Sequence, residues 1–145
     1  MSEARPARVD DTSKAEDPLL RMRAYRVACE LLRDAWDDAD ELRHHRATEK
    51  VSGQLYRAVG SIAANLAEGY SHSSGRDRAR IFEYALGSAR EAAVWYETAE
   101  PVLGSNVIAA RSVKLTEIRR LLLATIPRER LIRRQMGQKP KDTTD

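Results

Sequence analysis

The pair Glu41-x-x-His44 has the spacing of the ligands that hold iron in di-iron helix bundles. Such a site needs two of these pairs and two further carboxylates that project into the bundle. The sequence contains a single pair, at the predicted end of a helix, and His45 and His72 fall in predicted loops. We therefore predict no metal site, and interpret Glu41 and His44 as a solvated helix terminus.

Two nucleophilic side chains also lack the partners that catalysis requires. Ser61 has no histidine near it in the sequence and no nucleophile-elbow motif around it. Cys29 falls in a predicted apolar stripe, where a thiol is typically unreactive. The chain also lacks a glycine-rich phosphate-binding loop. These observations favour a protein with no enzymatic activity and no cofactor.

Polar side chains follow one face of a predicted helix, because residues three and four apart lie on the same side. The members of this line are Gln54, Arg57, Ser61, Asn65 and Glu68, and a similar line on the next predicted helix is Tyr84, Ser88 and Glu91. The line is either a contact face for a ligand or nucleic acid, or a set of hydrogen bonds between helices or subunits. From the residues alone we favour the second interpretation, since buried polar groups usually serve packing.

Basic side chains cluster in the second half of the chain. The candidates for binding nucleic acid are Arg76, Arg78, Arg80, Arg111, Lys114, Arg128, Arg130, Arg133 and Arg134. Lysine and arginine neutralise backbone phosphates, and residues 127–145 hold six basic and three acidic groups. Ordinary surface charge is the alternative, because the net charge of the chain is only +3 and we identify no aromatic stacking motif beside these residues.

The composition excludes several classes of protein. A chain of 145 residues fits one domain, and 42% hydrophobic with 32% charged residues is typical of a folded globular protein. It contains no apolar run long enough to cross a membrane and no secretory signal near Met1. A single cysteine excludes an internal disulfide, so we expect a cytoplasmic protein.

Apolar residues recur at helical spacing in four blocks, and clean alternation typical of strands is missing. We predict a first helix that begins at Asp17-Pro18, a second that begins near Thr48, and a third that is capped by Ser74 and ends or kinks at Pro101. The first helix should bury Tyr25, Ala28, Cys29, Leu32, Ala35, Trp36, Ala39 and Leu42. Gly104-Ser105-Asn106 is predicted as a loop before a fourth helix over about 107–126, which Pro127 interrupts.

Four helices with short connections predict an all-α, antiparallel up-down-up-down four-helix bundle. The expected organisation is a flexible acidic N-terminal segment (1–17), the bundle domain (18–126) and a basic, largely disordered C-terminal tail (127–145), in which 128–136 can form a short helical extension. The core contains many alanines and a single phenylalanine, Phe82. A core this thin favours an oligomer.

Two stretches resemble the motifs of a known family. Gln54-Leu55-x-Arg57-Ala58-x-x-Ser61-Ile62-x-x-Asn65-Leu66-Ala67-Glu68-Gly69 is similar to the signature of bacterial four helix bundle proteins, also called 23S rRNA-intervening-sequence proteins. Phe82-x-x-Ala85-Leu86-Gly87-Ser88-Ala89-Arg90-Glu91 resembles the second motif of that family. The similarity covers about residues 20–126, with Leu66 in place of the usual isoleucine and Ala89-Arg90 where a leucine-rich pattern is common. The matching motif positions are Arg57, Ser61, Asn65, Glu68, Gly69, Ser88 and Glu91.

The resemblance implies an antiparallel bundle that assembles into a homopentameric ring. Some members of the family are encoded within inserts of ribosomal RNA genes, and related proteins are accessory factors of diversity-generating retroelements, where they bind a reverse transcriptase and RNA. We therefore predict a non-enzymatic oligomeric accessory or scaffold protein that contacts RNA through repeated basic patches. The alternative is a protein–protein interaction scaffold with no nucleic-acid role. An enzyme that uses Ser61, Asn65 and Glu68 is the weakest hypothesis, since it lacks a base.

Overall fold

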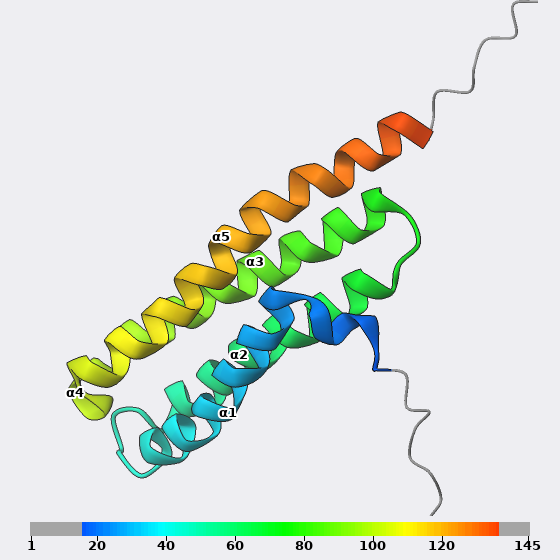
Figure 1. Ribbon diagram of the computed structural model, residues 1–145. Helices are drawn as coiled ribbons and strands as arrows, with labels where there is room; N and C mark the ends of the chain where they lie inside the picture. The colour runs from blue at the N-terminus through cyan, green and yellow to red at the C-terminus, as the bar shows by residue number, and fades with distance from the viewer. Residues whose placement is uncertain (1–15, 137–145) are drawn as a thin grey trace, which may run out of the picture.

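The computed structural model describes residues 16–136, with side chains as far as residue 132. This part of the chain is all helical, without a strand (Figure 1). The elements are η1 (Pro18–Arg21), α1 (Arg23–Arg43), α2 (Glu49–Ser71), α3 (Gly75–Thr98), α4 (Glu100–Leu103) and α5 (Ser105–Met136). Helices α1, α2, α3 and α5 are long, and none of the described helices is both long and apolar enough to cross a membrane.

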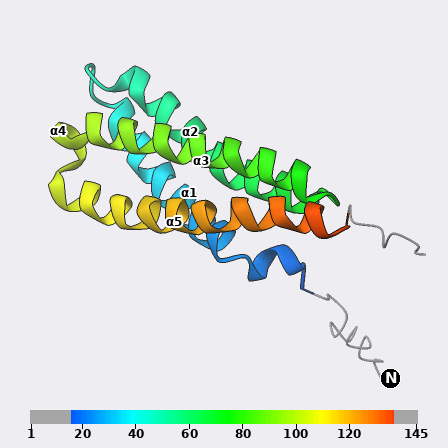
Figure 2. The same cartoon turned by 90° about the horizontal axis from the view of Figure 1, so that it is seen from above.

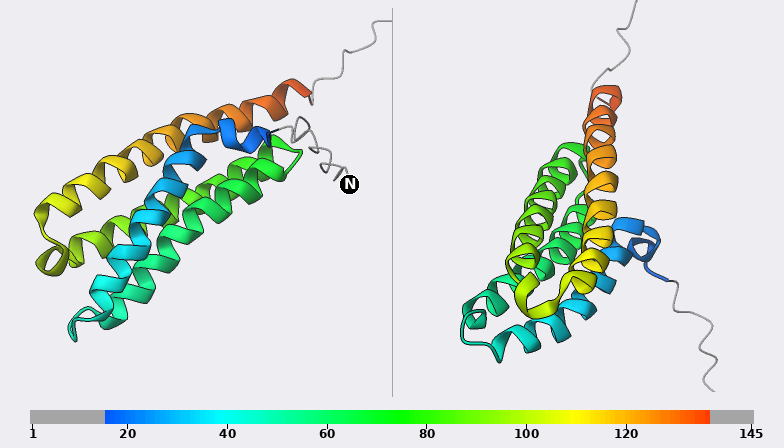
Figure 3. Two further views of the ribbon diagram at one scale, coloured as in Figure 1. Left: turned by 60° about the horizontal axis from the view of Figure 1, so that its bottom comes forward. Right: turned by 90° about the vertical axis from the view of Figure 1, so that its left-hand side faces the viewer.

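The four long helices lie side by side, each antiparallel to the next along the chain (Figure 2). Helix α1 packs on α2, α2 on α3, α3 on α5, and α5 returns to α1. This arrangement encloses one apolar core, whose largest fully buried side chains include Tyr96, Phe82, Leu31, Leu55 and Ile62. The first turns of α3 and the last turns of α5 extend past the start of α1, so α2, α3 and α5 build this end of the molecule (Figure 3).

Local sequence signals explain where most helices begin. The Ser74 hydroxyl accepts a hydrogen bond from the Asp77 amide at 3.1 Å, as its predicted role as the cap of α3 requires. Thr48 precedes α2 as predicted, but its hydroxyl donates to the Leu42 carbonyl at 2.7 Å and so closes the α1–α2 turn. Asp17 caps a short 3₁₀ turn and not α1, because Met22 is extended (ψ 111°) and α1 begins only at Arg23.

Half of the predicted buried face of α1 is confirmed, since Ala28, Ala35, Ala39 and Leu42 are buried, and the other half is wrong. Trp36 is 65% exposed, and Tyr25, Cys29 and Leu32 are only half-buried. Val27 and Leu31 enter the core in their place, and Asp38 is buried with them at 5% exposure. The face rotates toward Asp38 because this carboxylate is paired inside the bundle, as described below.

The second half of the fold departs from the prediction at one proline, Pro127, and at one loop, whereas α3 ends at Thr98, close to the end or kink predicted at Pro101. The short helix α4 follows α3, with Pro101 in its first turn, and Gly104 (φ +85°) makes the turn into α5. Helix α5 begins at Ser105, within the predicted loop, and continues through Pro127 without interruption to Met136. The predicted extension over 128–136 is therefore helical, but as part of α5. Most of the acidic segment predicted over 1–17, and residues 137–145, lie outside the described residues.

Candidate functional site

The N-terminal turns of α3 and the C-terminal turns of α5 bring several predicted arginines to one end of the bundle (Figure 1). Arg76, Arg78 and Arg80 come from α3, and Arg128 and Arg130 come from α5. The two backbones touch here because Gly75 has no side chain: an ideal Cβ on Gly75 would collide with the carbonyl oxygen of Glu129. We call these five arginines the basic end.

Two arginines of the basic end have carboxylate partners. Arg130 forms an ion pair with Glu83, and the Arg78 Nε lies 3.5 Å from Glu129 Oε2. The Arg78 guanidinium also lies 5.7 Å from the centroid of the Tyr70 ring, within range of a cation–π contact. The two carboxylate contacts join α3 to α5, and the Tyr70 contact joins α3 to α2. Together they leave less of either arginine's charge for an external partner.

The other three arginines of the basic end form no ion pair within the part of the chain that the structure describes. Arg76, Arg80 and Arg128 are exposed, and none of them forms an ion pair with a residue between 16 and 132. Arg133 and Arg134 lie further along α5, and their side chains fall outside the described residues. The structure thus brings Arg128 to the same end of the bundle as Arg76 and Arg80, as exposed cations, although Arg128 is far from the other two in the sequence.

Two further predicted cations, Arg111 and Lys114, lie elsewhere and are paired. The Arg111 guanidinium donates to both oxygens of Asp38, at 2.7 Å from Nε and 3.0 Å from Nη2. Lys114 Nζ lies 2.6 Å from Asp34 Oδ2. Their role in nucleic-acid binding stays a prediction. Because both cations are already paired with carboxylates, the basic end is the stronger candidate for a phosphate contact.

Asp38 also accepts a hydrogen bond from the Tyr96 hydroxyl at 2.7 Å, so one buried carboxylate joins α1, α3 and α5. Burial raises the pKa of the Tyr96 hydroxyl, and the hydrogen bond to Asp38 raises it further. The hydrogen bond to Asp38 likewise raises the pKa of the Arg111 guanidinium. We missed this network in the sequence, although Asp38 stands three residues after Ala35 and four before Leu42, on the core face.

The family-motif positions lie on α2 and α3, which pack closely against each other. Gly69 is buried, and an ideal Cβ there would lie 2.7 Å from the Phe82 ring, so the glycine lets α3 approach α2. Arg57 and Glu68 are exposed, and Ser61, Asn65 and Ser88 are half-buried. None of these five side chains has a hydrogen-bond partner within the described chain, whereas Glu91 accepts one from Trp95 Nε1 at 3.2 Å. The hydrogen-bonding capacity of these motif side chains is therefore largely unused within the described residues of one chain.

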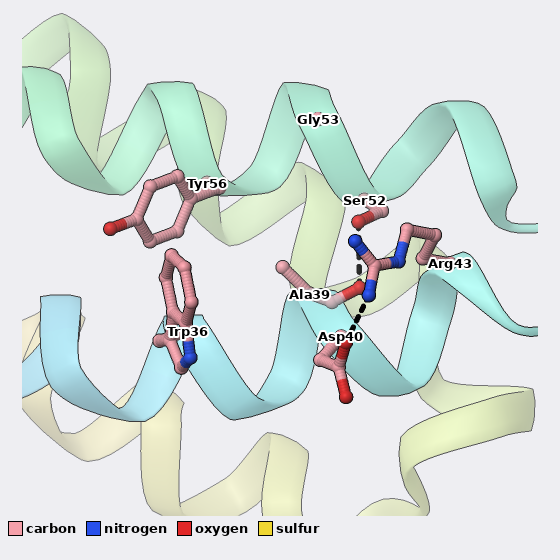
Figure 4. Close-up of a pocket in the computed structure, with 7 residues that line it drawn as sticks. All are labelled: Trp36, Ala39, Asp40, Arg43, Ser52, Gly53 and Tyr56. Atoms are coloured by element: carbon pink, nitrogen blue, oxygen red, sulfur yellow. Dashed lines mark hydrogen bonds and ion pairs between the residues drawn. The ribbon is translucent and has the colours of Figure 1, made fainter.

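A separate pocket of about 210 Å³ opens between α1 and α2 (Figure 4). It lies near the end of α1 and the start of α2, away from the basic end (Figure 1). It is lined by Trp36, Ala39, Asp40, Arg43, Ser52, Gly53 and Tyr56. The Trp36 and Tyr56 rings meet edge to face, with centroids 5.7 Å apart and planes at 71°. Sequence reasoning does not predict this pocket, because the apolar spacing of α1 places Trp36 in the core.

The residues tested for metal or nucleophilic chemistry do not gather into a site. Among the residues whose side chains the structure describes, no three histidine, cysteine, aspartate or glutamate side chains are placed to hold a metal ion. His44 is exposed, and its Nδ1 lies 2.6 Å from the Asp40 carbonyl. Cys29 is a free, half-buried thiol.

Comparison with known proteins agrees with this fold. Residues 21–124 match the family described as 23S rRNA-intervening sequence protein. The chain belongs to that family. A crystal structure of a protein of unknown function from the S23 ribosomal protein family of Bacteroides thetaiotaomicron has a similar fold, with a TM-score of 0.66 and 23% sequence identity over 71% of this chain and 97% of that one. No curated protein matches the chain.

Proposed function

We propose that this 23S rRNA-intervening sequence protein is a non-enzymatic, oligomeric accessory or scaffold protein that contacts RNA through the basic end. The observation that carries the proposal is the group of three exposed arginines, Arg76, Arg80 and Arg128, which lack a carboxylate partner in the described chain. Binding is electrostatic: each arginine that contacts a phosphate releases a counterion from the RNA. The family description, which refers to ribosomal RNA, favours RNA as the nucleic acid.

The oligomer in this proposal is a homopentameric ring. Two features support self-association: the unused polar groups of Ser61, Asn65 and Ser88, and the exposed apolar side chains Val113 (69%) and Leu131 (55%) on α5. A ring repeats the basic end around its axis, and several copies of a modest patch on one RNA increase the overall affinity. A reverse transcriptase is the protein partner that the family resemblance suggests.

The test of RNA contact is a charge-neutralised variant with a matched control. Arg76, Arg80 and Arg128 are replaced together by glutamine. A control variant makes the same replacement at three exposed arginines of the same two helices that lie farther from the basic end: Arg90, Arg119 and Arg120. Fluorescence anisotropy measures the dissociation constant of single-stranded RNA at several salt concentrations. The first variant should bind less tightly. The negative slope of the log association constant against log salt concentration should become shallower by about 2 for each chain in contact.

An unchanged affinity and slope in the first variant, or an equal loss in the control, would remove the basic end from the proposal. The oligomeric state is tested by size-exclusion chromatography with light scattering. The protein is purified at low salt without nuclease, and its absorbance is recorded at two ultraviolet wavelengths to detect bound nucleic acid. A ring-sized mass with nucleic acid that high salt removes supports an RNA scaffold. A ring of protein alone supports the alternative, a protein–protein scaffold with no nucleic-acid role, in which the exposed face of α5 is the main contact.

A further inference from the structure

Trp36 is a large apolar side chain that the core does not explain. It is 65% exposed on α1, and its only aromatic neighbour in the described chain is Tyr56 on α2, which meets it edge to face at 5.7 Å. The exposed Trp36 side chain lines the pocket between the two helices, together with Tyr56 (Figure 4). Exposed aromatic faces of this kind are the surfaces on which single-stranded bases stack, because every base has a π-face.

Gly53 lines this pocket from α2. It lies inside α2, where glycine is less favourable than alanine, and an ideal Cβ at Gly53 would meet no atom within 4 Å. Packing within the chain therefore does not require a glycine here. A methyl group would instead reduce the space of about 210 Å³ beside the Trp36 ring. A pocket of this size holds one planar group and leaves the rest of a nucleotide outside, since pockets for drug-sized ligands are larger, at about 300–1,000 Å³.

The polar rim of the pocket offers an acceptor beside a donor. Asp40 and Arg43 pair with each other on α1, and both side chains are more than half exposed. The Ser52 hydroxyl already donates a hydrogen bond to the Ala39 carbonyl at 2.6 Å. Asp40 and Arg43 are therefore the rim side chains that can hydrogen-bond to a ligand. A carboxylate has two acceptor oxygens, and a guanidinium has five N–H donors, of which the Asp40 contact occupies one.

Guanine complements this rim better than the other bases. Its Watson–Crick edge carries two adjacent donors, N1–H and N2–H₂, that match the two oxygens of a carboxylate, and its O6 lies next to them as an acceptor for arginine. Unpaired bases in RNA are recognised by this combination of stacking and hydrogen bonds to the base edge.

We propose that the pocket formed by Trp36, Gly53, Tyr56, Asp40 and Arg43 binds the base of an unpaired guanine in single-stranded RNA. This inference rests on the proposed function, because it assigns a second RNA contact to the same protein. The two contacts differ in their physics. The basic end has three exposed arginines that form no ion pair within the described residues, whereas the rim of the pocket is a neutral ion pair. Binding at the pocket therefore adds affinity that depends little on salt, and the basic end supplies the salt-dependent part.

The experiment uses the full chain and three fluorescein-labelled RNA heptamers: seven uridines, and the same sequence with a central guanosine or a central adenosine. Wild-type protein should bind the guanosine heptamer more tightly than the other two. Trp36→Ala should lose this preference and about tenfold of the affinity for the guanosine heptamer. Gly53→Ala should lose the preference while its melting temperature is not lowered, because the added methyl contacts nothing in the chain. Tyr84→Ala removes another exposed aromatic ring, on α3, and should keep the preference.

Equal affinity of the wild type for the three heptamers, or a preference that survives in Trp36→Ala, would overturn the inference. If the heptamers bind without a preference and neutralising Arg76, Arg80 and Arg128 still reduces the salt slope, the pocket proposal fails and the basic end stands. If no heptamer binds, both proposals fail. A loss of oligomer mass in Trp36→Ala, without a change in RNA binding, would assign the pocket to a protein contact and also overturn the inference.

Discussion

Replacing Tyr96 by phenylalanine tests the buried network directly, because it removes one hydrogen bond and little volume. The Tyr96 hydroxyl donates to Asp38 at 2.7 Å, and the tyrosine is 1% exposed. A hydrogen bond to a charged group contributes about 1.5–3 kcal/mol to stability. Asp38 keeps both hydrogen bonds from Arg111 in the variant, so we expect the lower value, a loss of about 1.5 kcal/mol near neutral pH.

This difference should shrink at high pH, since the folded protein raises the pKa of Tyr96 above its ordinary value of 10.0. Below the ordinary value both states keep the proton, and the stabilisation is complete. Above it the unfolded chain releases the proton while the folded chain retains it, so stability falls as pH rises. The loss is about 1.4 kcal/mol for each pH unit above the ordinary pKa. Wild-type and Tyr96→Phe proteins should therefore become equally stable near pH 11.

The assay is urea denaturation followed by circular dichroism of the helices, for both proteins at several values between about pH 8 and pH 11. Other titrating groups are the same in both proteins and cancel in the difference. Tyr84→Phe is the matched control, because it removes an exposed hydroxyl and should change the free energy of unfolding by less than about 0.5 kcal/mol at every pH. Two parallel stability curves for wild type and Tyr96→Phe over the whole range would refute the reasoning.

Two other changes test the packing. Asp38→Ala leaves the Tyr96 hydroxyl and the Arg111 guanidinium without their acceptor. In urea titrations it should lower the free energy of unfolding by about 3–5 kcal/mol. A loss below about 1 kcal/mol would mean that water replaces the carboxylate. Gly69→Ala presses a methyl against Phe82 and should lower that free energy by about 1–3 kcal/mol. Gly87→Ala meets nothing within 4 Å and should raise it by up to about 1 kcal/mol, so equal melting temperatures for the two alanine variants would contradict the close contact of α2 with α3.

The number of long helices and most of their ends follow from signals that act over a few residues. Apolar spacing gives the helical stretches, and Ser74 starts α3 as its type and position predict. The interruption predicted at Pro127 fails for a reason that lies outside the local sequence. Proline lacks one N–H, but the turns after it are held by long-range contacts: Arg130 with Glu83, and the close approach of Glu129 to Gly75. Tertiary packing thus outweighs a local break in the hydrogen-bond ladder.

The face of α1 could not be assigned from residue types, because two residues contradict the pattern in opposite directions. An apolar–polar pattern places Trp36 inside and Asp38 outside. The structure reverses them: Asp38 is buried because Tyr96 and Arg111, which lie 58 and 73 positions later in the chain, complete its hydrogen bonds. Trp36 is left outside beside Tyr56, a residue of the next helix. Each assignment depends on a partner that no local window contains, so both the buried network and the pocket were invisible in the sequence.

The same limit applies to the candidate cations, and here the consequence is electrostatic. In the sequence, all the candidate cations look alike. In the structure, Arg111 and Lys114 pair with Asp38 and Asp34. The exposed arginines of the basic end have no carboxylate partner within the described residues: Arg76, Arg80 and Arg128. The acidic groups of α1 that lower the net charge to +3 pair mostly away from the basic end. Helix α2 has 23 residues, so the two ends of the bundle are separated by about 35 Å. Salt screens charges over about 8–10 Å. If the proposed RNA contact forms, we therefore expect its phosphates to interact with the local arginines and not with the nearly balanced charge of the whole protein.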